Sequence, residues 1–297
     1  MAACAPVLMP RGLENDTPAF TDTYLLARDG EKLPARAWAP EHPRLVIVAL
    51  HGMGDHSSFI ALPAEDWAKR GIATLAFDQR GFGAAPHPGL WAGGDVMRQD
   101  YSDAVAAARA RYPGLPVYAL GESMGGAVVL SSYVKGGEAP AVDGIVLVAP
   151  AVWSRADMPF TYRALLWLTA HTFPGLTTSG RGVVRIWPSD NIPMLRAYSR
   201  DPLVQKTTRA DAVWGLVNLM DDARHAPEHL GPTPPILLVY GKNDQVIPAP
   251  PTEAVVAALG DRAEVHRYDK GYHMLLRGLD RETVWKDVMT WLERPRR

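Results

Sequence analysis

Continuous apolar runs recur along the chain and predict the strands of a buried sheet. They are rich in β-branched residues, which is typical of parallel strands covered on both faces. The runs cover residues 45–50, 72–77, 117–120, 145–149 and 236–240. Residues 264–268 alternate between apolar and polar side chains and predict an edge strand. Upstream, residues 23–28 and 33–38 flank Asp29-Gly30 and predict two strands joined by a turn.

Helical patterns lie between the apolar runs. They cover residues 95–112, 124–134, 252–259 and 282–292. Strands that alternate with helices indicate βαβ units. The alternation stops between Pro150 and Gly231, where the chain is rich in Trp, Leu and Pro. We therefore expect an α/β fold with a mostly parallel central sheet, flanking helices and a helical cap insertion.

This pattern also predicts how the chain is organised. We expect an N-terminal tail over residues 1–20 and the first part of the α/β core over 21–150. The cap should follow over residues 151–231, and the second part of the core over 232–297.

Composition narrows the classes of protein that fit. Hydrophobic residues make up 47% and charged residues 21%, so a large core can form. The net charge of -1 argues against a nucleic-acid partner, since such proteins usually carry a basic patch. The single cysteine, Cys4, excludes an intramolecular disulfide and a zinc site built from cysteines. The sequence contains no run of about 18 apolar residues, so it predicts no transmembrane helix. Composition does not indicate an oligomeric state.

The first residues allow two interpretations of location. Residues 1–6 resemble the end of a bacterial lipoprotein signal, although the apolar region that should precede Cys4 is absent. We expect an ordinary tail and a cytoplasmic protein. The alternative is a chain trimmed at the lipidation site and anchored to a membrane through Cys4.

Ser123 is the predicted nucleophile. It lies in Gly121-Glu122-Ser123-Met124-Gly125, directly after a short apolar strand and before a helical run. Such a strand-to-helix turn holds a serine in a strained conformation and exposes its hydroxyl. Glycines on both sides leave room for the tight turn.

A serine hydroxyl needs a base, and the base needs a third group to hold its tautomer. We predict His273 as the base, because it follows the last predicted strand in a loop. We predict Asp244 as the acid, because it closely follows the strand at residues 236–240. The order Ser, Asp, His is the order found when this turn occurs in an α/β sheet. His266 lies within a strand pattern and fits a structural role.

Backbone N–H groups should stabilise the oxyanion of the tetrahedral intermediate. We predict Met124, the residue after the nucleophile, as one donor. We predict Met53 as the other, because glycines flank it in the loop after residues 45–50. His51 should brace that loop.

Together these segments resemble the monoacylglycerol lipase and lysophospholipase branch of the α/β-hydrolases, also grouped with serine aminopeptidase-like hydrolases. The resemblance extends from about Asp29 to Leu292. It rests on HGMGDHS at 51–57, FDQRGFG at 77–83, GESMGG at 121–126, SRDPLV at 199–204, GKND at 241–244 and GYH at 271–273. Two departures bear on the substrate: Glu122 replaces the usual histidine, and residues 84–86 replace a segment that usually carries serine.

The resemblance implies a two-step ester hydrolysis through an acyl-enzyme, with no metal or organic cofactor. It suggests monoacylglycerol or lysophospholipid-like lipid esters as substrates. Apolar cap residues should then line an acyl pocket, and we select Trp153, Leu165 and Leu168. Peripheral membrane contact through the cap is a further expectation.

Other functions of the same fold stay open at this point. A short-chain carboxylesterase or an acyltransferase would use the same three residues. An aminopeptidase would need cap carboxylates for a free amine, and four are available: Asp157, Asp190, Asp201 and Glu228. A non-catalytic binding protein would be expected to lack one of Ser123, Asp244 and His273.

Overall fold

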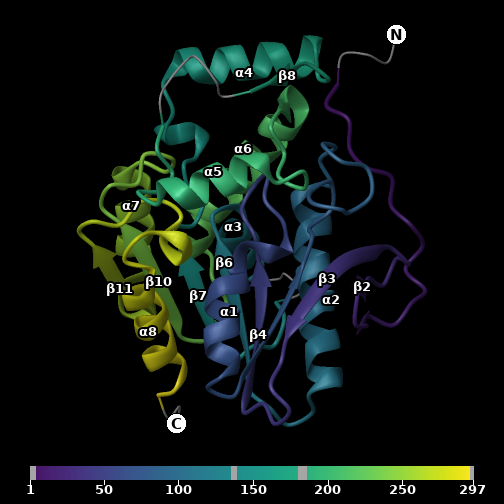
Figure 1. The fold of residues 1–297 in the computed structure, drawn as a ribbon. Helices are drawn as coiled ribbons and strands as arrows, with labels where there is room; N and C mark the ends of the chain where they lie inside the picture. The colour runs from purple at the N-terminus through teal and green to yellow at the C-terminus, as the bar shows by residue number, and fades with distance from the viewer. Residues whose placement is uncertain (1–4, 135–138, 180–185, 295–297) are drawn as a thin grey trace.

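A nine-stranded sheet forms the centre of the protein in the computed structural model, which describes residues 5–134, 139–179 and 186–294 (Figure 1). The strand order is β1-β2-β3-β5-β4-β6-β7-β10-β11. The strands β5, β4, β6, β7, β10 and β11 run parallel, whereas β1, β2 and β3 pair antiparallel. Their bounds are β1 Ala19–Phe20, β2 Tyr24–Leu26, β3 Lys32–Trp38, β4 Leu45–Leu50, β5 Ile72–Phe77, β6 Val117–Glu122, β7 Gly144–Val148, β10 Ile236–Gly241 and β11 Ala263–Tyr268.

The central strands are apolar throughout because helices cover both faces of the sheet. In β4, the side chains of Ile47 and Ala49 join one apolar cluster, and those of Val48 and Leu50 join the other. The first cluster contains residues of α1 (Ala61–Ala68) and α8 (Arg281–Leu292), and the second contains residues of α2 (Gly94–Arg111), α3 (Met124–Ser131) and α7 (Ala249–Leu259). Successive strand residues point to opposite faces, so an uninterrupted apolar run is what a doubly covered strand requires.

The chain between β7 and β10 holds the helices α4 (Phe160–Thr172), α5 (Ile192–Arg200) and α6 (Ala210–His225). A short pair, β8 (Thr177–Thr178) with β9 (Thr208–Arg209), links them. Figure 1 shows these helices above one end of the sheet, with α4 outermost. The helix α6 buries half of its residues, whereas Ala170 is the one buried residue of α4. The boundaries 151–231 for a separate cap stay a prediction.

The mostly parallel sheet, its flanking helices and the strand order confirm the predicted α/β fold. The hairpin at residues 23–38 is confirmed as β2 and β3, and the edge strand as β11. The helix α1 was missed by the sequence analysis. The tail prediction for residues 1–20 omitted contacts with the core: the Met9 N–H donates to the Trp91 carbonyl at 3.0 Å, and β1 begins at Ala19. Cys4 lies outside the described residues.

Among the residues that the structure describes, none of the helices combines the length and the apolar character needed to cross a membrane.

Candidate active site

Ser123 occupies the turn between β6 and α3 in a strained conformation. Its backbone has φ 54° and ψ -115°, a region that non-glycine residues rarely adopt and that costs about 1–3 kcal/mol. The end of β7 holds this turn. The Ser123 N–H donates to the Val148 carbonyl at 2.9 Å, and the Ser123 carbonyl accepts from the Ala151 N–H at 2.9 Å. The predicted nucleophile therefore lies where the surrounding structure maintains an unfavourable backbone.

Glycines make the turn possible through close backbone contacts. A Cβ at Gly121 would lie 2.5 Å from the carbonyl carbon of Gly125. A Cβ at Gly125 would lie 2.3 Å from the carbonyl oxygen of Leu50 in β4. Both distances are far below van der Waals contact, so a side chain at either position would force the strand and helix apart.

Asp244 and His273 are brought together across 29 residues of sequence. His273 Nδ1 donates to Asp244 Oδ2 at 2.7 Å, and the Asp244 side chain is fully buried. The other oxygen, Asp244 Oδ1, accepts the N–H groups of Val246 at 2.7 Å and Ile247 at 3.0 Å. Since Nδ1 carries the proton, the tautomer leaves Nε2 with a lone pair. That is the arrangement a general base requires.

The loops that carry the three predicted residues leave the same edge of the sheet. Ser123 follows β6, Asp244 follows β10 and His273 follows β11, and these strands run parallel in the order β6-β7-β10-β11. Open α/β sheets place their sites at the carboxyl ends of strands. The acid and base loops are tied together, because the Asn243 N–H donates to the Gly271 carbonyl at 2.9 Å.

The two predicted oxyanion donors lie in segments that adjoin Ser123, and their role stays a prediction. Met124 is the first residue of α3, and the first N–H groups of a helix have no intrahelical partner. Met53 lies in a turn closed by the Asp55 N–H, which donates to the Gly52 carbonyl at 3.2 Å. Gly54 adopts φ 76° in that turn, a value that favours glycine. A Cβ on Gly52 would lie 3.2 Å from Ser123 Cβ, so the loop passes close to the predicted nucleophile.

His51 stabilises the loop around Met53 from inside the core. It is completely buried, and burial lowers the pKa of its imidazole. Its Nδ1 donates to the Gly52 carbonyl at 2.7 Å, and its Nε2 accepts the Gln79 N–H at 2.9 Å. A neutral ring with both nitrogens engaged inside the core supports the predicted structural role.

A buried ion cluster beside Ser123 was missed by the sequence analysis. Arg277 Nη2 donates to Glu122 Oε1 at 2.8 Å and to Asp55 Oδ2 at 2.7 Å. The available signal was the charge of Glu122 at the end of an apolar strand, because such a group needs a partner when buried. The partner, 155 residues away, is not visible in the local sequence.

The residues selected for the acyl pocket differ in exposure. Trp153 is half-buried against the core, whereas Leu165 and Leu168 are 62% and 51% exposed on α4. Their role in acyl binding stays a prediction.

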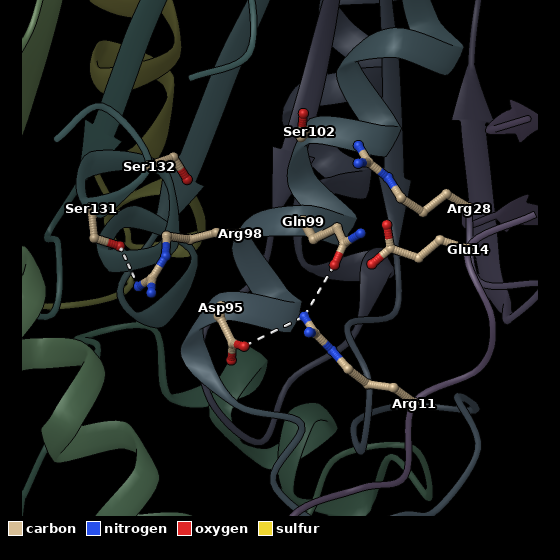
Figure 2. A pocket seen from close by; sticks show the side chains of 9 residues that line it. All are labelled: Arg11, Glu14, Arg28, Asp95, Arg98, Gln99, Ser102, Ser131 and Ser132. Atoms are coloured by element: carbon tan, nitrogen blue, oxygen red, sulfur yellow. Dashed lines mark hydrogen bonds and ion pairs between the residues drawn. The ribbon is translucent and has the colours of Figure 1, made fainter. Parts of the chain in front are cut away.

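A polar groove of about 340 Å³ lies between α2 and the N-terminal segment, beside the C-terminal end of α3 (Figure 2). Its arginines are engaged: Arg11 with Gln99 and Asp95, Arg28 with Asp103, and Arg98 with Asp222. Because nearby carboxylates neutralise this charge, and Ser123 lies at the opposite end of α3, the groove adds nothing to the predicted chemistry.

A mostly parallel sheet with a strained serine turn after β6 and a buried Asp–His pair after its last strands is the α/β-hydrolase fold. The family model described as Serine aminopeptidase, S33 matches residues 41–280. The chain belongs to this family.

Two curated relatives align with this chain over most of their length. The chain is 25% identical over 276 residues to the monoacylglycerol lipase of Mycolicibacterium smegmatis, covering 89% of this chain and 93% of the relative. It is 25% identical over 298 residues to the human monoglyceride lipase, covering 95% and 94%.

Solved structures show the same fold. A soluble variant of the monoglyceride lipase from Saccharomyces cerevisiae, in complex with a substrate analog, aligns with a TM-score of 0.75 at 17% identity, covering 96% of this chain and 98% of that chain. The Paleococcus ferrophilus monoacylglycerol lipase aligns with a TM-score of 0.71 at 21% identity, covering 88% and 98%.

Proposed function

We propose that the protein hydrolyses carboxylic esters of lipids, monoacylglycerols foremost, through an acyl-enzyme on Ser123. The observation that carries this proposal is the 2.7 Å hydrogen bond from His273 Nδ1 to the buried Asp244 carboxylate. It gives the imidazole the tautomer of a general base at the sheet edge that also bears the strained serine turn. The relatives named as monoacylglycerol and monoglyceride lipases support the substrate class.

The mechanism follows from these groups. His273 Nε2 takes the proton of the Ser123 hydroxyl as its oxygen attacks the ester carbonyl carbon. The Met53 and Met124 N–H groups donate to the oxyanion. His273 then gives its proton to the departing glycerol oxygen, and the acyl group stays on Ser123. A water molecule, deprotonated by the same base, attacks the acyl carbonyl carbon, and His273 returns the proton to Ser123 Oγ as the fatty acid leaves. No step requires a metal or an organic cofactor.

The outer cap helix supports a role at a lipid surface. Phe160, Leu165 and Trp167 of α4 are 74%, 62% and 54% exposed. Exposed apolar patches of this kind mark interaction sites, and aromatic side chains suit the boundary between lipid and water. We propose that α4 makes peripheral contact with lipid when the enzyme meets its substrate.

Aminopeptidase activity is the second candidate, because of the family description, but the cap carboxylates do not favour it. Asp157 accepts from Ser154 Oγ at 2.8 Å, and Asp201 pairs with His56 at 3.0 Å. Asp190 accepts the Leu279 N–H at 2.9 Å, and Glu228 pairs with His225 at 3.8 Å. Three of these carboxylates thus already accept an intramolecular hydrogen bond, and Glu228 is half exposed beside His225.

The decisive experiment replaces the nucleophile. Ser123→Ala keeps the Cβ of the strained turn and should fold like the wild type. We expect hydrolysis of a monoacylglycerol to fall by about 10⁴-fold or more, and labelling by a fluorophosphonate to disappear. Ser102→Ala in α2 is the matched control and should retain both activities.

A substrate series tests the ester class. We expect 2-oleoylglycerol to be hydrolysed faster than p-nitrophenyl acetate and an aminoacyl arylamide. Activity confined to acetate esters would replace the proposal with a short-chain esterase. Turnover of the arylamide alone would establish an aminopeptidase. Ser123→Ala with most of the wild-type activity would refute the assigned nucleophile.

A further inference from the structure

Arg277 joins the two segments that carry the predicted oxyanion donors. Its Nη2 donates to Asp55, two residues after Met53, and to Glu122, two residues before Met124. The side chains of Arg277, Asp55 and Glu122 are 9%, 4% and 3% exposed. We infer that Arg277 is a positioning residue that fixes the Met53 and Met124 N–H groups relative to each other. The inference rests on the proposed function.

The contact with Asp55 fixes the loop around Met53 because Asp55 is tied to its own backbone. Asp55 Oδ1 accepts the His56 N–H at 2.9 Å, while Oδ2 accepts from Arg277. The Asp55 N–H closes the turn on the Gly52 carbonyl. A displacement of the carboxylate would therefore shift the turn and the direction of the Met53 N–H.

The contact with Glu122 fixes the other donor. Glu122 is the last residue of β6 and directly precedes Ser123. Among the described residues, Glu122 Oε2 has no hydrogen-bond partner, so Arg277 supplies the side-chain hydrogen bond of this carboxylate. A buried carboxylate with one satisfied oxygen depends strongly on its partner's position.

The electrostatics keep Arg277 charged. Burial by itself lowers the pKa of Arg277, but the Asp55 and Glu122 carboxylates outweigh burial and hold this pKa above its ordinary value. Burial raises the pKa of Glu122, and Arg277 opposes that rise. One guanidinium thus serves two carboxylates. This partner also gives a physical reason for glutamate at a position where the resembling lipases usually have histidine.

The cluster extends to the cap. The guanidinium of Arg277 lies 5.5 Å from the ring centroid of Tyr198 in α5. The cap also contacts the Met53 loop directly, since the Gln205 N–H donates to the Gly54 carbonyl at 2.8 Å. Arg277, which follows the predicted base His273, therefore contacts the Met53 loop on one side. Residues after α5 contact the same loop from the cap.

The test is Arg277→Lys, because lysine keeps the charge but its side chain has a shorter reach and lacks the planar guanidinium. We expect kcat for monoacylglycerol to fall by about 100-fold, the effect of a misplaced catalytic group, with KM within a few-fold of wild type. Arg80→Lys is the matched control, because buried Arg80 also binds two carboxylates, Asp29 and Asp100. It should lower the unfolding temperature and leave kcat per folded enzyme unchanged.

A second variant protects the test against misfolding. Asp55→Asn, Glu122→Gln and Arg277→Met together remove all three charges at similar volume, which avoids an unpaired buried carboxylate. We expect this triple variant to fold and to keep the low kcat. A kcat within threefold of wild type in Arg277→Lys or in the folded triple variant would overturn the inference and leave a purely structural ion cluster.

The rate of Ser123 phosphonylation separates this inference from the proposed function. A fluorophosphonate presents its P=O oxygen to the oxyanion donors whatever the natural substrate is. We expect its second-order rate constant to fall with kcat in Arg277→Lys. If the wild type hydrolysed no lipid ester but lost phosphonylation rate on Arg277→Lys, the substrate proposal would fail and the positioning role would stand. An unchanged phosphonylation rate would refute the positioning role.

Discussion

The strand β4 and the cap helix α4 are both rich in apolar residues but lie in opposite surroundings. Every residue of β4 is buried, whereas Phe160, Leu165 and Trp167 of α4 are all more than half exposed. The apolar side chains of β4 are removed from water by the helices on both faces, so they contribute to folding. The three exposed side chains of α4 contribute little to folding and remain available to a partner outside the chain.

The largest expected effect concerns the sheet edge, where function depends on one hydrogen bond. Asp244→Asn keeps the shape of the side chain but favours the wrong tautomer of His273. We expect kcat to fall by about 10⁴-fold with little change in the unfolding temperature. Steady-state kinetics on monoacylglycerol would measure this. Asp269→Asn, a nearby side chain that is 80% exposed, should retain activity; equal losses in both variants would contradict the assignment of Asp244.

Two tryptophans compare how much the buried core and the exposed helix α4 contribute to the free energy of unfolding. Trp67 of α1 is completely buried, whereas Trp167 of α4 is 54% exposed. We expect Trp67→Ala to reduce the free energy of unfolding by about 3–5 kcal/mol. Trp167→Ala should cost about 0.5 kcal/mol, as at most exposed positions. Urea unfolding measures both values. Similar losses at the two positions would mean that α4 is covered in solution.

The smallest expected effect sharpens the proposed role of the cap. Leu165→Ser should weaken binding to phosphatidylcholine vesicles by about 10-fold or more, since one buried apolar side chain contributes about 1.5–3 kcal/mol. Vesicle flotation measures the bound fraction. Leu13→Ser is the control, because Leu13 is 80% exposed on the N-terminal segment. Unchanged vesicle binding in the α4 variant would exclude α4 as the lipid contact.

Local sequence patterns were sufficient to predict the strands and turns that carry the candidate site. The run at residues 236–240 predicted β10, and the glycines around Ser123 predicted a strand-to-helix turn. These signals are local because burial on both faces and close backbone contacts restrict which residue types fit. The helix α1 was missed because its eight residues contain a proline and follow a 3₁₀ turn, which gives a weak helical pattern.

Contacts between distant segments could not be predicted in the same way. Arg277 follows the predicted base by four residues, but its contacts with Asp55 and Glu122 span 222 and 155 residues. A charged residue in a loop normally faces water, so the sequence position of Arg277 favours an exposed side chain. The outward apolar face of α4 was equally hidden, because the sequence shows apolar residues without showing what covers them.

The sequence by itself determined the α/β fold, the strained turn at Ser123 and the order of the predicted acid and base. Each depends on backbone conformation or on a repeating burial pattern, and both are encoded over a few residues. The tertiary structure decided that His273 donates to Asp244, that Arg277 joins the two donor segments and that α4 faces outward. These features depend on how segments more than twenty residues apart pack together, and packing is a property of the whole fold.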